Sequence, residues 1–140
     1  MSRDLKGPVK ITAEQLELIT EHAIRDAPNE CCGFVAVKGD VATRVLVAEN
    51  EAHSPLRFEI SGKQLFQLID EIESAGEELG AIYHSHTRSA PYPSQTDINF
   101  AAGWPGIEWL IVGVKDGLTE VKSYLITDGV VSDVPVAIAG

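Results

Sequence analysis

Residues 79–97 read LGAIYHSHTRSAPYPSQTD, and this stretch indicates how the middle of the chain folds. The apolar run 79–86 predicts a central strand. Residues 87–93 contain two prolines and predict a loop. Ser94 is a favourable helix N-cap residue, so we expect a short helix to begin there and to end before Gly103. The stretch therefore predicts a strand, a loop and a helix in direct succession.

The polar residues of this stretch have the types and spacing of a metal site. Because side chains alternate across a strand, His84 and His86 project from one face, about 7 Å apart at Cα, and Ser85 points the other way. Asp97 lies in the first turn of the expected helix, which the loop can bring close to the histidines. Two imidazoles and one carboxylate leave a fourth position open for water, as in catalytic zinc sites. The alternative is that Ser94 and Asp97 form only a capping box.

Hydrophobic periodicity outward from this stretch predicts an α+β fold, in which a mixed β-sheet is packed by about three helices. The two other expected helices begin at N-caps and end at breakers, and they run from Thr12 to before Pro28 and from Ser61 to Gly76. The other expected strands are 32–37, 41–48, a short one at 58–60, 108–115, 120–127 and 130–138. No repeat or linker divides the sequence, so we expect one domain over residues 1–140.

Composition narrows the class of protein. A hydrophobic fraction of 44% and a charged fraction of 23% are ordinary for a folded domain and argue against disorder. The formal charge of −10 weighs against a nucleic-acid partner. There is no apolar run of the ~18–20 residues that span a bilayer, and no signal-peptide pattern, so we expect a cytoplasmic protein with no membrane partner. The adjacent Cys31 and Cys32 are unsuited to a disulfide framework, and we expect them to be reduced residues packed inside a strand.

A hydrolytic zinc site also needs a group that moves protons, usually a carboxylate. The residues alone do not select one of the 21 acidic side chains. Glu30 is attractive because it opens an expected strand, and Glu51 and Glu59 are the fallback acids. The remaining histidines, His22 and His53, are expected on the surface.

The pattern His-Ser-His-x7-Ser-x2-Asp resembles the zinc motif of the JAMM (MPN+) metalloproteases at each required position. The surrounding Tyr-His-Ser-His-Thr, the run Tyr-Pro-Ser-x-Thr-Asp and the ending Pro-Val-Ala-Ile are most similar to the compact bacterial branch, which includes enzymes of the CysO–cysteine peptidase type. The resemblance implies a single MPN (JAMM) domain with a cytidine-deaminase-like fold. It also implies one Zn²⁺ per chain, held by His84, His86 and Asp97 with water as fourth ligand. Glu30 would then be general base and acid, and Ser94 would donate to the oxyanion.

The same resemblance implies a substrate. JAMM enzymes cleave peptide or isopeptide bonds after the Gly-Gly tail of ubiquitin-like proteins. For the bacterial branch this is a β-grasp sulfur carrier, from which cysteine is released during cysteine biosynthesis or a short C-terminal extension is removed. Asn50, Ser54 and Arg57 lie where family members shape a groove for the substrate tail. The chain lacks the two insertions of polyubiquitin-specific members, and a homodimer is left open.

Three other readings are less well supported by the residues. A non-catalytic MPN scaffold has generally lost the zinc ligands, which are present here. A zinc deaminase requires a Pro-Cys-x-x-Cys pair that the sequence lacks. The DNA-repair-associated RadC proteins typically carry His-x-His-Pro, whereas Thr87 follows His86 here.

Overall fold

The strand that carries His84 and His86 lies near the middle of an eight-stranded sheet in the computed structural model, which describes residues 7–139. The sheet order is β7-β6-β5-β4-β2-β3-β1-β8. β4 is antiparallel to β2 and parallel to β5, so the sheet is mixed and the α+β prediction is confirmed. Along the chain the elements are β1 (Lys10–Ile11), α1 (Ala13–Asp26), β2 (Cys32–Lys38), β3 (Val41–Ala48), α2 (Gly62–Ser74), β4 (Glu78–His86), α3 (Gln95–Ala101), β5 (Glu108–Lys115), β6 (Leu118–Thr127), β7 (Val130–Val134) and β8 (Ala137–Ile138).

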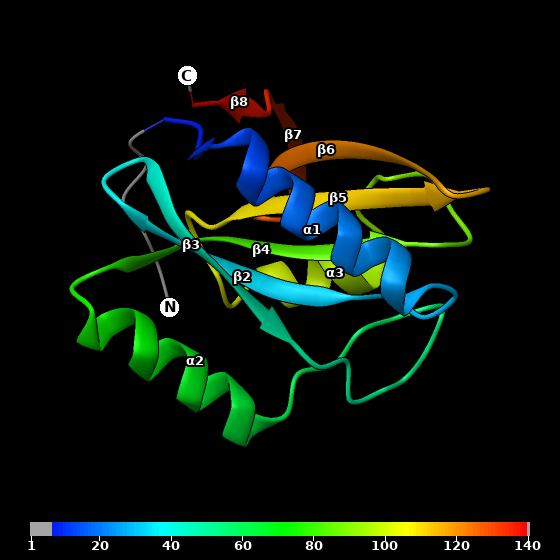
Figure 1. The fold of residues 1–140 in the computed structure, drawn as a ribbon, viewed down its shortest axis with the longest axis horizontal. Coiled ribbons are helices and arrows are strands. Elements are labelled where there is room, and N and C mark those ends of the chain that lie inside the picture. The colour runs from blue at the N-terminus through cyan, green and yellow to red at the C-terminus, as the bar shows by residue number, and fades with distance from the viewer. Residues whose placement is uncertain (1–6, 140) are drawn as a thin grey trace.

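The three helices divide between the two faces of the sheet. Figure 1 shows α1 crossing in front of the strands and α3 behind them. One buried cluster joins α1 to the front face, through Ile19 and Ala23 packed near Tyr83. The other joins α2 and α3 to the opposite face, through Ile72 and Ala101. No helix within the described residues is long and apolar enough to cross a membrane.

All three helices begin at the expected N-caps. Thr12 and Gln15 form a reciprocal capping box at the start of α1. Ser61 accepts from the backbone N–H of Gln64 at the start of α2. Ser94 caps α3. These side chains satisfy backbone N–H groups that have no partner within the helix, which is why the boundaries could be placed from sequence.

The predicted strand at 58–60 is wrong, because these residues form no strand and belong to the irregular segment before α2. The side chain of Asn50 replaces a strand partner here. Its Oδ1 accepts from the backbone N–H of Glu59 at 3.0 Å and from that of Ala52 at 3.0 Å. Because the Asn50 side chain already accepts from these backbone N–H groups, the segment does not need to pair with a neighbouring strand.

The predicted strand at 130–138 is two strands, β7 and β8, which lie at opposite ends of the sheet order. Only Pro135 and Val136 separate them. Pro135 has no N–H for a ladder, so the strand ends before it. Because the chain reaches from one edge of the sheet to the other in these few residues, the sheet curls until its edges approach each other. Figure 1 shows β8 beside β7 at this closure.

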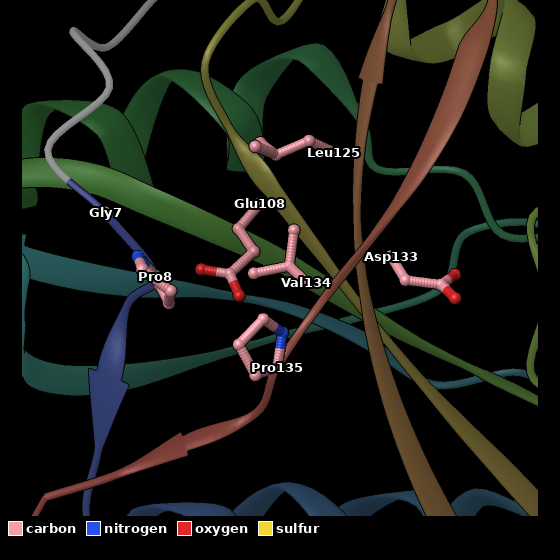
Figure 2. Close-up of a pocket in the computed structure, with 7 residues that line it drawn as sticks. All are labelled: Gly7, Pro8, Glu108, Leu125, Asp133, Val134 and Pro135. Carbon is pink, nitrogen blue, oxygen red and sulfur yellow. The ribbon is translucent and has the colours of Figure 1, made fainter.

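A buried carboxylate anchors the closure. Figure 2 shows Glu108 among Pro8, Val134 and Pro135, in a cavity of ≈ 330 Å³. Its carboxylate accepts from the backbone N–H of Val9 at 2.8 Å and from the hydroxyl of Ser123. Glu108 therefore holds the segment before β1 against β5 and β6.

Candidate metal centre

The ends of β4 and α3 bring three potential metal ligands together. The Nε2 atoms of His84 and His86 lie 3.1 Å apart, and Oδ2 of Asp97 lies 3.1 Å from the first and 3.2 Å from the second. All three side chains are buried. Within residues 7–139 this is the group of His, Cys, Asp and Glu side chains whose donor atoms are close enough to hold one ion.

The spacing of these atoms fits zinc. Bonds of about 2.0–2.2 Å at tetrahedral angles place two ligand atoms about 3.3 Å apart. The observed triangle of donor atoms is nearly equilateral and has almost this edge length. His86 Nδ1 donates to the carbonyl of Ala90 at 2.9 Å, so in the neutral form of the ring, which a metal ion requires, the Nε2 lone pair is directed into the triangle. The three residues therefore fit a tetrahedral ion with one position open.

The capping box that competed with the metal reading is also present. Ser94 Oγ accepts from the backbone N–H of Asp97 at 3.1 Å, and Asp97 Oδ2 accepts from the backbone N–H of Ser94 at 2.9 Å. The same Oδ2 faces both imidazoles. The box thus holds the carboxylate in place for the histidines, and the two readings are compatible.

The electrostatics of the cluster favour a cation. Burial lowers the pKa of His84 below its usual value, against the attraction of Asp97. Burial also lowers the pKa of His86, but hydrogen bonds to Asp97 and Ala90 outweigh it, so that the pKa is raised overall. Burial alone would raise the pKa of the Asp97 carboxyl, but hydrogen bonds from the two imidazoles hold it far below its usual range. A buried carboxylate anion therefore faces two ring nitrogens.

Aromatic rings cover the inner side of the cluster. The ring of Phe58 lies 4.8 Å from that of His84, and Trp109 meets His84 edge-on at 6.2 Å. His84 is completely buried. These rings exclude water from one side of the site, which strengthens electrostatic interactions within it.

The structure places Glu30 next to this cluster. Glu30 lies two residues before Cys32, the first residue of β2, and Cys32 pairs with His84. The side chain is 5% exposed. Burial raises the pKa of its carboxyl from 4.5 to about 7. The charge of His86 lowers this pKa and that of Asp97 raises it, but both effects are smaller than that of burial. The fallback acids Glu51 and Glu59 are exposed.

The segment between β3 and α2 holds Glu30 from outside the sheet. Asn50 Nδ2 donates to the carbonyls of Glu30 and Arg57, each at 3.0 Å. The backbone N–H of Glu30 donates to the carbonyl of Ser54 at 2.9 Å. The side chain of Arg57 itself is exposed and pairs with Glu59 at 3.0 Å. Asn50 and Ser54 thus support Glu30, which the sequence did not indicate because the contacts span about 20 residues.

The prediction for His22 is wrong, and that for His53 is confirmed. His53 is exposed. His22 is 3% exposed on the sheet side of α1, three residues after the buried Ile19. Its Nδ1 lies 2.7 Å from the hydroxyl of Tyr83, and its Nε2 lies 3.1 Å from Asp26. Both ring nitrogens therefore have partners, which makes the burial of a histidine tolerable.

Cys31 and Cys32 are buried and free, as expected. Cys32 is the first residue of β2 and Cys31 precedes it. Burial raises the pKa of both thiols to about 12, so they are protonated and unreactive in the folded chain. They take no part in the metal cluster.

Comparison with known proteins gives consistent matches. The family model described as prokaryotic homologs of the JAB domain matches residues 12–127. The chain is 33% identical to the CysO-cysteine peptidase of Mycobacterium tuberculosis, over 90% of this chain and 88% of that protein. It is 38% identical to the desampylase of Haloferax volcanii, over 71% of this chain and 73% of that protein. It is 32% identical to a probable TtuB-protein conjugate cleaving protease of Thermus thermophilus, over 81% and 73%.

Solved structures share the fold. A protein from Desulfitobacterium hafniense aligns with a TM-score of 0.79 and 26% identity, covering 93% of this chain and 92% of that one. A JAB1/MPN domain protein from Archaeoglobus fulgidus aligns with a TM-score of 0.62 and 20% identity, covering 94% and 99%. At that identity the second match shows the fold alone.

Proposed function

The chain belongs to the family of prokaryotic JAB-domain homologues, and from that premise we propose that it is a zinc-dependent peptidase. The reaction is hydrolysis of the peptide or isopeptide bond after the C-terminal Gly-Gly of a ubiquitin-like sulfur carrier. The observation that carries this proposal is the triangle of His84, His86 and Asp97 donor atoms beside the buried Glu30. Such a set offers three metal ligands and one proton-transfer group, which is what a zinc hydrolase requires.

Each residue has a distinct part in the proposed reaction. A zinc ion would supply Lewis acidity, lowering the pKa of a water in its open position and polarising the scissile carbonyl. Glu30 takes one proton from the attacking water and passes it to the leaving nitrogen as the C–N bond breaks. In the metal-free chain burial raises the pKa of its carboxyl to about 7, close to the pH at which it must both take and give a proton. Ser94 lies exposed at the rim with its Oγ accepting from Asp97, so its O–H is free to donate to the oxyanion.

The class of substrate is supported by the relatives. One is named for a CysO-cysteine substrate, one as a desampylase and one for TtuB-protein conjugates. We propose that this chain likewise acts on a small carrier with a C-terminal Gly-Gly, releasing cysteine, a short extension or a conjugated protein. A cytoplasmic location is proposed with it, and the free Cys31 and Cys32 are consistent with a reducing compartment.

Metal content tests the first half of the proposal. We expect about one zinc per chain in the wild type and a sharp fall in His84→Ala and Asp97→Ala. Glu30→Gln serves as the matched control and should retain zinc. Metal content unchanged by either ligand substitution would overturn the zinc assignment.

Cleavage tests the second half. A β-grasp carrier ending in Gly-Gly-Cys is incubated with the zinc-loaded chain, and the product mass is followed. We expect loss of cysteine with the wild type and a decrease of about 10²–10⁴-fold in rate with Glu30→Gln. Glu51→Gln, an exposed acid in the segment before α2, should keep the wild-type rate. Full activity of Glu30→Gln would contradict the assigned role, and no cleavage by the wild type would contradict this substrate.

A further inference from the structure

Glu30 lies outside the strand pairing that fixes the metal ligands of β4. The register between β2 and β4 ends at the pair Cys32 and His84, two residues after Glu30. The backbone ladder therefore does not set the distance between Glu30 and the ligands, and a strand end without further contacts opens easily. The proposed reaction needs this distance to be fixed, because a misplacement of about 1 Å can cost about 10²-fold in rate. Other contacts have to hold the backbone of Glu30.

Two hydroxyl groups at the end of β4 supply such contacts. Ser85 and Thr87 alternate with the two histidine ligands along the chain, so their side chains leave the opposite face. Ser85 Oγ accepts from the backbone N–H of Cys31 at 2.8 Å, and the backbone N–H of Ser85 donates to the carbonyl of Cys31 at 3.2 Å. Thr87 Oγ1 donates to the carbonyl of Pro28 at 2.7 Å. These bonds hold the chain on both sides of Glu30.

Thr87 also contacts the segment that supports Glu30 from the other side. Its Oγ1 lies 3.5 Å from the carbonyl of Pro55, a longer contact than the bond to Pro28. Pro55 follows Ser54, whose carbonyl accepts from the backbone N–H of Glu30 at 2.9 Å. Figure 1 shows the turn after α1 meeting the long segment after β3. One side chain, directly after the last ligand of β4, thus touches both segments that hold Glu30.

We propose that Thr87 is a positioning residue for the reaction, because its hydroxyl holds the backbone of Glu30 at a fixed distance from the metal ligands. The inference rests on the proposed function, in which Glu30 transfers the proton. Thr87 acts through the Pro28 carbonyl, two residues before Glu30, and not on the reacting atoms. Rigid support of this kind keeps a functional side chain within about 0.5 Å of its productive place.

The position of the Thr87–Pro28 bond makes it suitable for substitution. The bond is exposed, so water can satisfy the Pro28 carbonyl when the hydroxyl is removed. Thr87→Val removes the hydroxyl and keeps the branched shape, whereas Thr87→Ser keeps the hydroxyl and removes the methyl group. Both variants should therefore fold, and the lost bond should loosen the backbone around Glu30 without unfolding the chain.

Hydrogen exchange at single backbone amides of the full chain tests this bond without a substrate. In Thr87→Val the amides of Glu30 and Cys31 should exchange about fivefold faster than in the wild type, as expected for the loss of one hydrogen bond. Thr87→Ser should restore the wild-type rates. The amide of Val35, in the middle of β2, reports the stability of the sheet and should be unchanged. Equal exchange at Glu30 and Cys31 in Thr87→Val and the wild type would overturn the proposal.

Cleavage of the Gly-Gly-Cys carrier tests the positioning role. Thr87→Val should retain its zinc and lower kcat about tenfold with little change in KM, because only the steps after binding need Glu30 in place. Thr87→Ser should recover most of the wild-type kcat. Thr20→Val is the matched control, because its hydroxyl donates to the carbonyl of Glu17 at 3.0 Å within α1. This control should leave kcat unchanged.

A second background shows whether Thr87 acts through Glu30. In Glu30→Gln, the further change Thr87→Val should not lower the residual rate, because the carboxylate that Thr87 positions is already absent. A further decrease in that background, or loss of zinc from Thr87→Val alone, would overturn the proposal. Absence of cleavage by the wild type would contradict the proposed function instead, and the exchange rates then confirm or overturn the Thr87–Pro28 contact by themselves.

Discussion

At the scale of single residues, the carboxyl group of Glu30 is coupled to the stability of the fold. Its pKa is about 7 in the folded, metal-free chain and near 4.5 when exposed, so the folded state binds the proton more tightly. The stability linked to this proton is fully present below about pH 4.5 and is lost as pH rises through about 7. The loss amounts to about 3 kcal/mol in the free energy of unfolding, from 1.36 kcal/mol per pKa unit.

This effect is measured by urea denaturation in the presence of a chelator at several pH values between 5 and 8. The wild type should lose stability relative to Glu30→Gln as pH rises, because glutamine has no charge to bury. The difference between the two proteins removes the contributions of the other titrating groups. Parallel stability curves would show that Glu30 is solvated in the metal-free chain.

Tyr124 supports the loop that orients His86, and this contact gives a second prediction at the scale of single residues. His86 Nδ1 donates to Ala90, and the next carbonyl, that of Pro91, accepts from the hydroxyl of Tyr124 at 2.5 Å. Tyr124→Phe removes the second bond and frees this part of the loop. Because such outer partners are worth about 10–100-fold in metal affinity, we expect zinc to bind about tenfold more weakly. Competition with a chromophoric chelator measures this change.

Tyr92→Phe is the matched control for this substitution. The ring of Tyr92 lies 5.4 Å from that of Tyr124, but its hydroxyl makes no hydrogen bond among the described residues. Zinc affinity should be unchanged in this variant. Equal affinities in both variants and the wild type would mean that the loop holds His86 without Tyr124.

At the scale of elements, the close packing of β2 on β4 depends on a glycine. Gly33 pairs with Tyr83, and a Cβ at Gly33 would overlap the Tyr83 ring. The ring cannot move aside freely, because its hydroxyl is 2.7 Å from His22 Nδ1 under α1. Gly33→Ala should therefore lower the free energy of unfolding by about 1–3 kcal/mol. Thermal or urea denaturation measures this cost.

Gly62→Ala provides the comparison for this prediction. Gly62 is the first residue of α2, and nothing lies within 4 Å of a Cβ placed there. Alanine should leave stability equal or raise it by up to about 1 kcal/mol, since it restricts the unfolded chain and favours the helix. Equal losses in both variants would contradict the assignment of the Gly33 cost to Tyr83.

What the sequence predicts well at this scale is set by local chemistry. The N-caps at Thr12, Ser61 and Ser94 depend on contacts three residues apart, so the helices were predictable. The His-x-His spacing likewise follows from strand alternation. The strand predicted at 58–60 failed because the Asn50 side chain, nine residues from Glu59, takes the place of a ladder partner.

Features that depend on contacts between residues far apart in the chain could not be predicted from the sequence. The two-residue β1 exists because β3 and β8 pair with it from far along the chain. The support of the loop by Tyr124 joins residues 33 positions apart, and no local pattern marks it. His22 was predicted on the surface because histidine is a polar residue. Its position three residues after Ile19, on the same helix face, indicated burial instead.

At the scale of the whole molecule, the candidate metal site ties together elements that share few other contacts. Its ligands come from the end of β4 and the first turn of α3. Between them lies a loop with exposed residues at 88–90. In the metal-free chain, the buried carboxylate of Asp97 and the two imidazoles depend on one another for neutralisation. An ion bound only by the folded chain therefore stabilises the chain as a whole.

We expect zinc to raise the thermal midpoint of the chain and a chelator to lower it again. At a free zinc concentration 1,000 times the dissociation constant, the gain is about 4 kcal/mol. For a chain of this length that corresponds to a shift on the order of 10 °C. Calorimetry with and without zinc measures the shift, and His84→Ala should show almost none while Glu51→Gln shows all of it. An equal shift in His84→Ala would mean that zinc stabilises the chain elsewhere, because a site that has lost one of three buried ligands cannot bind the ion with comparable affinity.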